Sequence, residues 1–310
     1  MKIIGPDALV FGVDDVDSAV QYLRDYGLRP VGVDSSGGRF EALDGTAVIV
    51  RRHDDSSLPA AVRPAPSLRE TIYGVADRAS LDAIAAELRK DRDIRRDADG
   101  SFRSVDDMGF ALKFQLTQRR AFTASADLTN APGAPPQRGV NQLGITPDML
   151  TVPRTLSHVV LFVSDAVKAE AFYERLGFRT ADRMGSGPFM RPAGTLEHHT
   201  LFMIEVPAFM QGVEHFAFHV GSGTEVLLAG TRFEAKGYKT SWGPGRHLLG
   251  SNWFWYFNSP FGCHVEYDAD MDLHDDTWVA RELAPGADNS QLFLFKAREK
   301  WFPGGGPPTE

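Results

Sequence analysis

Three polar residues interrupt apolar, strand-like stretches in the C-terminal half of the chain. His158 lies in Leu-Ser-His-Val-Val, His215 in Val-Glu-His-Phe-Ala, and Glu266 in His-Val-Glu-Tyr. A single histidine in such a strand is usually a core residue that needs one hydrogen-bond partner. A buried glutamate carboxylate, in contrast, needs a cation or donors to compensate its charge. A divalent metal would compensate all three residues together, and two histidines with one carboxylate favour non-haem Fe(II) with open coordination positions.

The composition is that of a globular protein. The chain has 310 residues, 43% hydrophobic and 24% charged, which suggests about two domains of ordinary size. A formal net charge of −8 argues against a nucleic-acid partner. No long apolar run or secretory signal is present, so we expect no membrane partner and a cytoplasmic location. Cys263 is the only cysteine, so a metal must be held by histidines and carboxylates.

The two halves of the chain repeat one another. Residues 19–29 match residues 169–179 at a constant offset of 150, and both segments predict an amphipathic helix that ends at a glycine. An apolar strand precedes each helix, and β-rich runs follow it. A second helix is expected at about 81–90 in the first half and 225–236 in the second. Each half therefore predicts two β-α-β-β-β modules and an α+β fold.

A Pro/Gly-rich stretch at residues 130–139 is unsuited to regular structure and marks the connection between the halves. The predicted division is an N-terminal domain at 1–120, a linker at 121–153, a C-terminal catalytic domain at 154–285 and a C-terminal extension at 286–310.

The repeat also serves as a control for the metal hypothesis. The offset places Ala8 opposite His158, and aligning the turns before the last strands places Lys113 opposite Glu266. Neither residue can replace its counterpart as a ligand. If packing alone required the polar residues, both copies should carry them. The difference favours a metal site in the C-terminal domain and an N-terminal domain without metal ligands.

A further motif is the Gly-Pro-Gly-Arg-His segment that ends at His247, followed by Asn252, by Tyr256 and by Glu266. With the repeat and the triad, it resembles the vicinal oxygen chelate superfamily, and within it the two-domain type I extradiol ring-cleaving dioxygenases. In that family a Gly-Pro-x-Arg-His turn carries an active-site histidine, a tyrosine follows nine residues later, and the ligand glutamate ten residues after that. The resemblance implies two tandem glyoxalase-like domains, each an open barrel of two modules.

The family also places a catalytic histidine upstream of the second ligand, in a His-x-Thr-like context. The segment His198-His199-Thr200 matches this context. We favour His198, because its register fits the family pattern and strand alternation would send His199 to the opposite face. His199 remains the alternative and is a candidate for substrate binding.

The resemblance implies extradiol cleavage of an aromatic diol with O2, with both oxygen atoms incorporated into the product. The triad would bind Fe(II), or Mn(II) in its place. His198 would assist O2 activation and proton transfer, His247 would stabilise the bound substrate, and Tyr256 would hydrogen-bond the diol. The expected partners are O2 and a small aromatic diol. A homo-oligomer is expected because family members commonly assemble.

Several positions bear on the substrate. Val160 is of the kind seen in relatives that take hydrophobic catechols, and an aromatic wall could be formed by Phe189, Trp242, Trp253 and Phe254. Trp242 stands where relatives that handle acid-bearing catechols use an arginine. Asn252 is a further candidate for substrate binding. Leu249 and the glycine after it replace the Asn-Asp pair of biphenyl-diol enzymes, so a substituted monocyclic catechol and an apolar bicyclic diol both remain open.

Three other functions share parts of this pattern. A hydroquinone- or aminophenol-cleaving dioxygenase would use the same triad. A glyoxalase-like lyase or isomerase typically needs a second carboxylate at the metal as base. A protein that only binds aromatic ligands usually lacks the complete triad.

Overall fold

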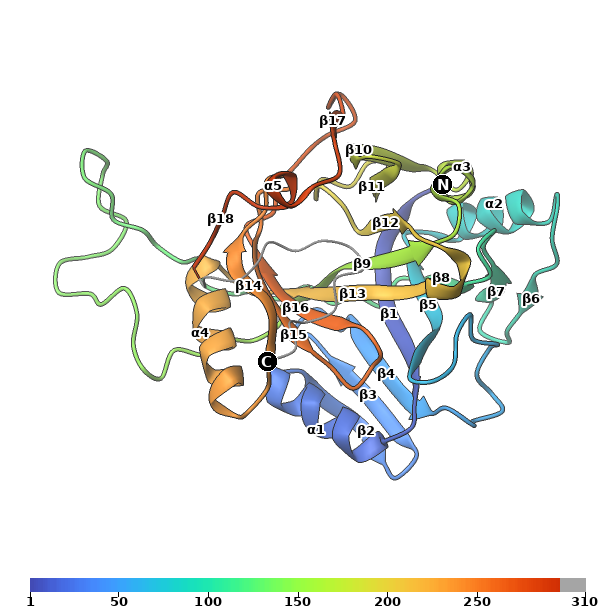
Figure 1. Ribbon diagram of the computed structural model, residues 1–310, viewed down its shortest axis with the longest axis horizontal. Helices are drawn as coiled ribbons and strands as arrows, with labels where there is room; N and C mark the ends of the chain where they lie inside the picture. The colour runs from blue at the N-terminus through green and yellow to red at the C-terminus, as the bar shows by residue number, and fades with distance from the viewer. Residues whose placement is uncertain (296–310) are drawn as a thin grey trace.

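The computed structural model describes residues 1–295, and two sheets organise this part of the chain (Figure 1). Each half contributes one sheet and contains two β-α-β-β-β modules, which confirms the predicted α+β fold. Within the described residues neither sheet closes, because the hydrogen-bonded order of each has two free ends. Residues 296–310 of the expected C-terminal extension lie outside the described part of the chain.

The first sheet has eight strands in the order β2-β3-β4-β1-β5-β8-β7-β6. Its central pair is antiparallel, and each central strand has a parallel neighbour on its outer side. The elements are β1 (Ile3–Val13), α1 (Val16–Tyr26), β2 (Arg29–Asp34), β3 (Gly37–Glu41), β4 (Ala47–Arg52), β5 (Ser67–Val75), α2 (Arg78–Leu88), β6 (Arg95–Arg96), β7 (Phe102–Val105) and β8 (Ala111–Leu116).

The second sheet repeats this order as β10-β11-β12-β9-β13-β16-β15-β14, and one short strand extends it at each end. The topology therefore carries the same internal repeat as the sequence. The elements are β9 (Thr155–Val163), α3 (Ala166–Arg175), β10 (Phe178–Met184), β11 (Gly187–Pro192), β12 (Leu201–Glu205), the 3-10 helix η1 (Ala208–Met210), β13 (Gly212–His219), α4 (Gly223–Ala235), β14 (Thr240–Arg246), β15 (Trp253–Asn258), β16 (His264–Ala269), β17 (Arg281–Leu283), α5 (Ala287–Ser290) and β18 (Phe293–Leu294).

Side-chain caps set the helix starts. The Asp15 carboxylate accepts a hydrogen bond from the backbone N–H of Ser18, and the Asp165 carboxylate accepts one from that of Lys168. Gly27 follows α1 in the left-handed conformation, with φ of 107°, as the terminal glycine predicts. The two expected second helices form as α2 and α4. The described residues contain no helix of the length and apolarity needed to cross a bilayer.

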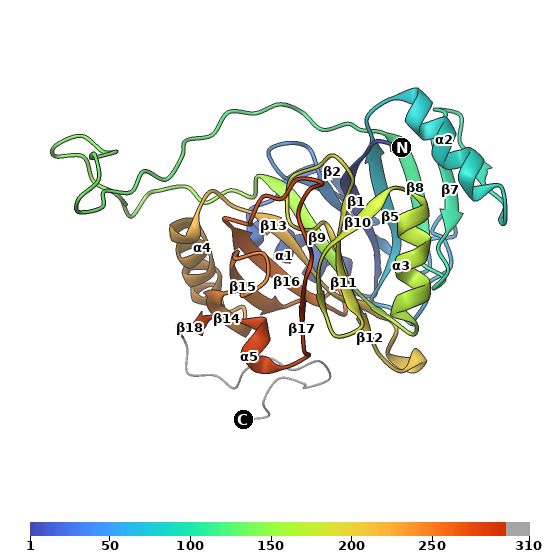
Figure 2. The ribbon, with the colours of Figure 1, turned by 90° about the horizontal axis from the view of Figure 1, so that it is seen from above.

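Residues 117–154, which we call the arm, contain neither helix nor strand and project from the body (Figures 1 and 2). The tip is held by its own hydrogen bonds. The side-chain oxygen of Asn130 accepts from the backbone N–H groups of Gln137 and Arg138 at 2.9 and 2.8 Å. The irregular structure agrees with the predicted Pro/Gly-rich linker, and the exact domain boundaries stay a proposal.

The two halves share one apolar core. The ring of Phe11 in β1 lies 5.3 Å from that of Phe216 in β13 and 5.2 Å from that of Phe261. Helix α1 lies beside α4, and α2 lies beside α3, so helices of different halves are neighbours (Figure 1). Since each sheet has one face in this core, the opposite face of the second sheet is left for the functional site.

A reciprocal contact joins the halves next to the triad. The Tyr26 hydroxyl donates to the backbone oxygen of Glu266 at 2.6 Å, and the Tyr267 hydroxyl donates to the backbone oxygen of Tyr26 at 2.7 Å. The two tyrosine rings stack with centroids 4.0 Å apart and planes within 3°. The end of α1 is therefore fixed to the backbone of the strand that carries Glu266.

The N-terminal copy carries other residues at the positions of the ligands. Ala8 packs in a small apolar cluster with Ala47 and Ile72. The Lys113 ammonium lies 3.3 Å from the Asp97 carboxylate. Within the described chain, the group of side chains that could hold a metal ion lies in the C-terminal half. The N-terminal sheet therefore keeps the frame without the ligands, as the repeat predicted.

Candidate metal centre

The three predicted ligands meet on neighbouring strands. β9, β13 and β16 lie side by side in the second sheet and carry His158, His215 and Glu266. The Nε2 atoms of the histidines are 3.0 Å apart, and they lie 3.1 and 3.3 Å from one oxygen of Glu266. All three side chains are buried. The predicted convergence of the three strands is confirmed.

The donor set fits a metal ion. Ligand atoms that bind one divalent ion at roughly 2.1 Å and at right angles lie about 3.0 Å apart, close to the distances observed. Among the described residues, neither oxygen of the buried Glu266 carboxylate has a hydrogen bond of good geometry, although the imidazoles lie close to it. Burial raises the pKa of Glu266, but the neighbouring histidines hold it well below its usual range. The site thus presents a buried anionic carboxylate beside two imidazoles, a donor set that a divalent metal ion would bind.

Two β-bulges turn the chain neighbours of the histidines toward the site. The pairing of β9 with β13 shifts register at Glu214 and at Ser157, which makes each an extra residue in its strand. Without a bulge, successive side chains would point to opposite faces. Here the Glu214 carboxylate contacts Nδ1 of His215, and the Ser157 hydroxyl lies 2.8 Å from Nδ1 of His158.

A buried carboxylate takes part in each of these two arrangements. The Ser157 hydroxyl donates to Asp268 at 2.9 Å, and the second oxygen of Glu214 lies 3.1 Å from Nδ1 of His264. Burial lowers the pKa of His215, but the Glu214 carboxylate raises it to about 9. Burial also raises the pKa of Glu214, whereas the charge of His215 lowers it to about 2. Such partners fix the ring orientation of metal-binding histidines and leave Nε2 directed at the site.

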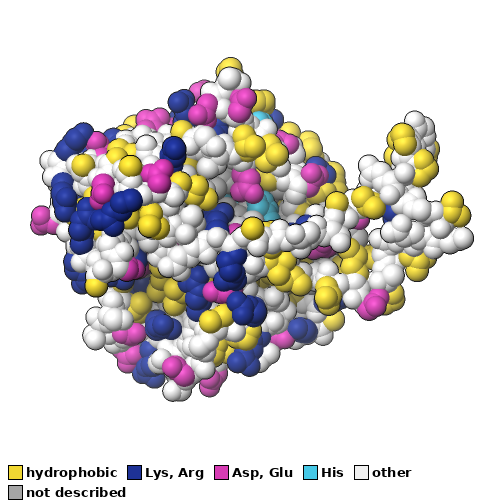
Figure 3. Space-filling model, turned by 180° about the vertical axis from the view of Figure 1, so that it is seen from behind, with side chains coloured by type: hydrophobic (Ala, Val, Ile, Leu, Met, Phe, Trp, Pro, Cys, Tyr) yellow, Lys and Arg dark blue, Asp and Glu magenta, His cyan; other side chains and the backbone are white. Residues whose placement is uncertain are grey.

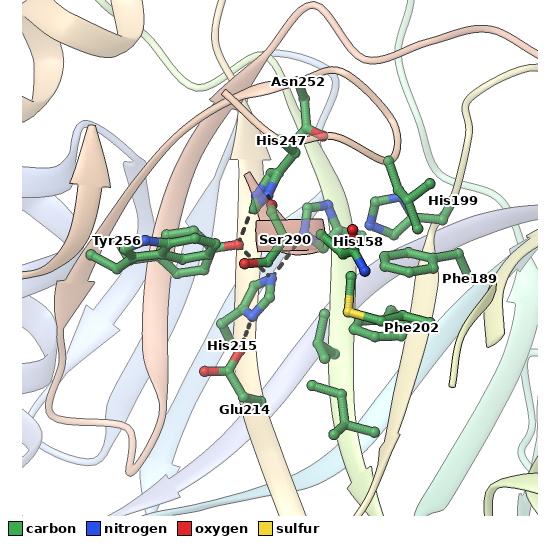
Figure 4. Close-up of a pocket in the computed structure, with 16 residues that line it drawn as sticks. His158, Phe189, His199, Phe202, Glu214, His215, His247, Asn252, Tyr256 and Ser290 are labelled. Carbon is green, nitrogen blue, oxygen red and sulfur yellow. Dashed lines mark hydrogen bonds and ion pairs between the residues drawn. The ribbon is translucent and has the colours of Figure 1, made fainter. Parts of the chain in front are cut away.

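An apolar pocket opens beside the triad (Figure 4). The rings of Phe189 and Phe202 stack there with centroids 3.8 Å apart. Trp242 packs beside the ring of Tyr256 at 5.0 Å and donates to the Gln291 side chain at 2.8 Å. The predicted residues that line the pocket are His158, Val160, Phe189, His199, His215, Trp242, His247, Asn252 and Tyr256.

The placement predicted for His198 is wrong. His199 lines the pocket, with its ring 4.4 Å from that of His158, whereas His198 points away and its Nε2 lies 2.8 Å from the Asp182 carboxylate. The prediction assumed strand alternation, but residues 198–200 precede β12 and do not form a strand. Burial and the nearby imidazoles hold the pKa of His199 well below its usual value.

The Gly-Pro-Gly-Arg segment is a strand, β14, rather than the expected turn, and His247 follows its end. Nδ1 of His247 lies 2.8 Å from the backbone oxygen of Ser290, which can only accept, so Nδ1 carries the proton. Nε2 then accepts from the Tyr256 hydroxyl at 3.2 Å. Burial raises the pKa of Tyr256 well above its usual value, so this hydroxyl stays protonated.

Several residues of the site were not predicted. Glu214 and Ser157 stand directly before a ligand in the sequence, but only the bulges turn them inward. Asp182 and Ser290 reach the site from β10 and α5, where no local pattern marks them. Phe202 could have been found, since it follows the His-His-Thr segment on an apolar strand.

Comparison with known proteins agrees with this geometry. Residues 155–267 match the family model described as Glyoxalase/Bleomycin resistance protein/Dioxygenase superfamily, so this segment is similar to the domains of that superfamily. The resemblance predicted from the motifs is thereby confirmed at this level. The matched segment begins with β9 and ends just after Glu266, and it contains all three candidate ligands.

Two curated relatives are similar to part of the chain. Metapyrocatechase 2 from Cupriavidus necator is 38% identical over 163 residues, which cover 51% of this chain and 49% of the relative. An iron-dependent extradiol dioxygenase from Rhodococcus jostii (strain RHA1) is 30% identical over 148 residues, 43% of this chain and 49% of the relative. The chain thus aligns with about half the length of these relatives.

A solved structure shares the complete fold. The Mn(II)-bound glyoxalase from Novosphingobium aromaticivorans has a TM-score of 0.72 and 23% sequence identity, with 99% of this chain and 93% of that chain covered. At this identity the likeness establishes the architecture of both halves together. It does not establish the reaction, which must be inferred from the residues of the site.

Proposed function

We propose that this protein is an Fe(II)-dependent extradiol dioxygenase that cleaves the ring of an aromatic diol and incorporates both atoms of O2. The observation that carries the proposal is the buried facial triad of His158, His215 and Glu266, placed at one end of an apolar pocket. The similarity to metapyrocatechase 2 and to an iron-dependent extradiol dioxygenase supports iron as the metal. Mn(II) remains the alternative, since the same ligand types suit both ions.

A bound Fe(II) would hold the diol oxygens and O2 in one place and lower the pKa of the diol. Around it, we assign roles to three pocket residues. Tyr256, with its hydroxyl 3.5 Å from Nε2 of His215, would hydrogen-bond a diol oxygen next to the ligands. His247 holds that hydroxyl as its acceptor and would stabilise the bound ring. His199 replaces His198 as the group that exchanges protons with substrate and oxygen.

The proposed substrate is an uncharged catechol or a small apolar diol. The described residues that line the pocket include no lysine or arginine, and the side away from the ligands is aromatic and aliphatic. A carboxylate substituent would enter without a compensating charge. Asn252 is the polar exception, because its buried side-chain amide finds no partner in the described part of the chain. The Asn252 amide would form a hydrogen bond with a polar substituent of the substrate or with the second hydroxyl of the diol.

A glyoxalase-like lyase or isomerase is the second candidate, because the solved structure named above is a glyoxalase. Such chemistry typically needs a second carboxylate at the metal, and Glu214 is the carboxylate that lines the pocket. It contacts Nδ1 of His215, the ring nitrogen on the side away from the other ligands. This contact argues against Glu214 as the base.

The test is anaerobic reconstitution with Fe(II), followed by a panel of catechols in air. Ring cleavage should give yellow products from alkyl- or halogen-substituted catechols, with both atoms of labelled O2 in the product after allowance for solvent exchange. The matched control is His215→Ala, which removes one ligand. Colourless mixtures across the panel, or one labelled atom, would reject the proposal, while hydroquinone or aminophenol cleavage would be separated by its product spectra.

We also propose a cytoplasmic homo-oligomer. The arm carries exposed apolar side chains, among them Val140, Leu143 and Leu150, and it projects from the body with hydrophobic groups at its surface (Figure 3). Such exposure suggests that it is covered in solution. Light scattering should give a multiple of the 34.1 kDa chain mass, and cell fractionation should recover the protein in the cytosol.

A further inference from the structure

A chain of hydrogen bonds leads from the pocket to a buried carboxylate. Nδ1 of His199 lies 2.9 Å from Nδ1 of His198, and Nε2 of His198 lies 2.8 Å from the Asp182 carboxylate. All three side chains are buried, at 4%, 0% and 0% exposure. His199 is the member that lines the pocket (Figure 4).

The far end of this chain is held firmly. One Asp182 oxygen accepts the backbone N–H of Arg281 at 2.7 Å, and the other accepts the Arg281 Nε–H at 3.0 Å. A register shift between Thr180 and Asp182 marks a bulge in β10 at the place where this carboxylate turns inward. Burial raises the pKa of Asp182, but His198 and Arg281 lower it well below its usual range. The carboxylate is therefore ionised, and it can only accept hydrogen bonds.

These contacts determine where the imidazole protons lie. Because Asp182 only accepts, Nε2 of His198 must carry a proton. Arg281 already forms an ion pair with Asp182, so these contacts require only the Nε2 proton of His198, and its Nδ1 is then an acceptor. Nδ1 of His199 must donate to that acceptor. Nε2 of His199, the ring nitrogen left for molecules in the pocket, consequently carries no proton.

We propose that Asp182 and His198 are positioning residues that hold His199 in the tautomer whose unprotonated Nε2 serves the pocket. The inference rests on the proposed function for the role of His199, but the tautomer itself does not depend on any reaction. Proton acceptance by His199 requires this tautomer, because a neutral imidazole with its proton on Nε2 can only donate from that atom. The arrangement follows the general logic of a carboxylate that orients a catalytic histidine, here with a second histidine between them.

A purely structural role explains the contacts less well. A buried ion pair with an added imidazole is seldom more stable than apolar residues of the same volume. Phe189 and Phe202 lie in the same region and show that the surrounding structure accepts apolar side chains. A polar chain that begins at His199, a pocket histidine outside the triad, is better explained by control of that histidine.

The decisive variant is Asp182→Asn. Its amide can donate to Nε2 of His198, which would move the His198 proton to Nδ1 and the His199 proton to Nε2. We expect kcat of the Fe(II)-loaded enzyme to fall about 100-fold or more, with KM for the diol and the affinity for Fe(II) changed by less than about threefold. The matched control is Glu170→Gln, which removes another ion-paired carboxylate outside the pocket and should leave kcat unchanged.

The second readout is 15N NMR of the histidine rings in protein loaded with diamagnetic Zn(II). The His199 resonances, assigned with a His199→Asn variant, should show a protonated Nδ1 in the wild type and a protonated Nε2 in Asp182→Asn. A wild-type His199 with its proton on Nε2 would overturn the inference, and this measurement needs no variant of Asp182 to fold. A flipped tautomer with unchanged kcat would also overturn it. If wild type shows the expected tautomer but cleaves no diol, the proposed function fails and the tautomer assignment stands.

Discussion

Glu214 and His215 are neighbours in the sequence, yet their side chains lie on the same side of β13, and the Glu214 carboxylate contacts Nδ1 of His215. The bulge at Glu214 makes this contact possible. His158 is held in the same way by Ser157, and His199 by His198. Each of these three histidines therefore has its Nδ1 fixed by the residue before it, which leaves Nε2 for the site.

Replacing Glu214 should weaken metal binding. Partners of this kind contribute roughly 10- to 100-fold in metal affinity, so we expect Glu214→Leu to weaken Fe(II) binding by about that factor and Glu214→Gln by less. The measurement is anaerobic competition with a chromophoric ferrous chelator. Glu225→Gln is the control, because Glu225 is also buried and ion-paired but lies outside the pocket. An affinity equal to wild type in Glu214→Leu would show that the contact does not support the ligand.

Tyr256→Phe should lower turnover and spare the metal. The hydroxyl stays protonated and lies 3.2 Å from Nε2 of His247, so a bound diol oxygen can replace His247 as the acceptor of its proton. Losing one buried hydrogen bond at the reacting group should reduce kcat about 10- to 100-fold. Iron content after reconstitution should match wild type. Equal turnover of the two proteins on a good substrate would remove Tyr256 from the proposed chemistry.

Metal binding should stabilise the fold. Without an ion, the Glu266 carboxylate is buried among imidazoles with no hydrogen bond of good geometry in the described part of the chain. A ligand that binds only the folded state adds about 2.7 kcal/mol to the free energy of unfolding at 100 times its Kd. Anaerobic thermal unfolding should therefore show a higher Tm with excess Fe(II) than with a chelator. The His215→Ala variant should lose most of that increase, and a Tm independent of metal in wild type would contradict a bound ion.

Asn252→Leu should stabilise the protein and weaken its binding of diols that carry a hydrogen-bonding substituent. A buried amide without a partner costs about 1–3 kcal/mol, so the leucine variant should be more stable by about 1–2 kcal/mol in urea unfolding. The backbone hydrogen bond from His247 N–H to the Asn252 oxygen, at 3.0 Å, does not involve the replaced side chain. KM should rise for diols with a hydrogen-bonding substituent and change little for alkyl catechols. A loss of stability would indicate that the amide is satisfied in solution.

Asp106 should make stability depend on pH in a direction opposite to that of most carboxylates. Burial raises its pKa to about 6, although Met108 and Phe110 N–H groups and the Tyr173 hydroxyl donate to it. Since the folded pKa lies above the unfolded one, the contribution is fully present below about pH 4 and is lost as pH rises through 6. The loss is about 3 kcal/mol. Asp106→Asn removes this dependence.

The comparison to make is the difference in free energy of unfolding between Asp106→Asn and wild type, measured in urea at pH 4.5 and at pH 7.5. The difference should move in favour of the asparagine variant by about 2–3 kcal/mol at the higher pH. Equal differences at the two pH values would mean that the folded carboxyl has an ordinary pKa.

Much of the fold could be predicted because the two halves of the sequence carry the same pattern. The match of residues 19–29 with 169–179 fixed both helices and their modules, and the strand order repeats as well. The short strands β17 and β18 were not predicted. They pair with β10 and β14 at the edges of the sheet. Strands as short as these take their conformation from the neighbouring strand rather than from their own sequence.

The ligands of the site could be predicted because a carboxylate and two histidines in apolar strands are chemically conspicuous. The residues that orient them could not. An extra residue such as Glu214 or Ser157 becomes a bulge only through the register of its partner strand, which no local pattern reveals. His198 was misplaced for a related reason, because alternation was applied to a segment that does not pair as a strand.

The stacked pair of Tyr26 and Tyr267 gives the ligand-free half a lasting importance. The N-terminal half has no ligands of its own at the equivalent positions, but it bonds to the backbone of the strand that carries Glu266. The N-terminal half therefore cannot be removed without disturbing that strand. The half that carries the ligands thus depends on a contact with the half that lacks them. An engineer who wishes to reduce this protein to a minimal catalyst should therefore keep α1 and redesign the arm, not the reverse.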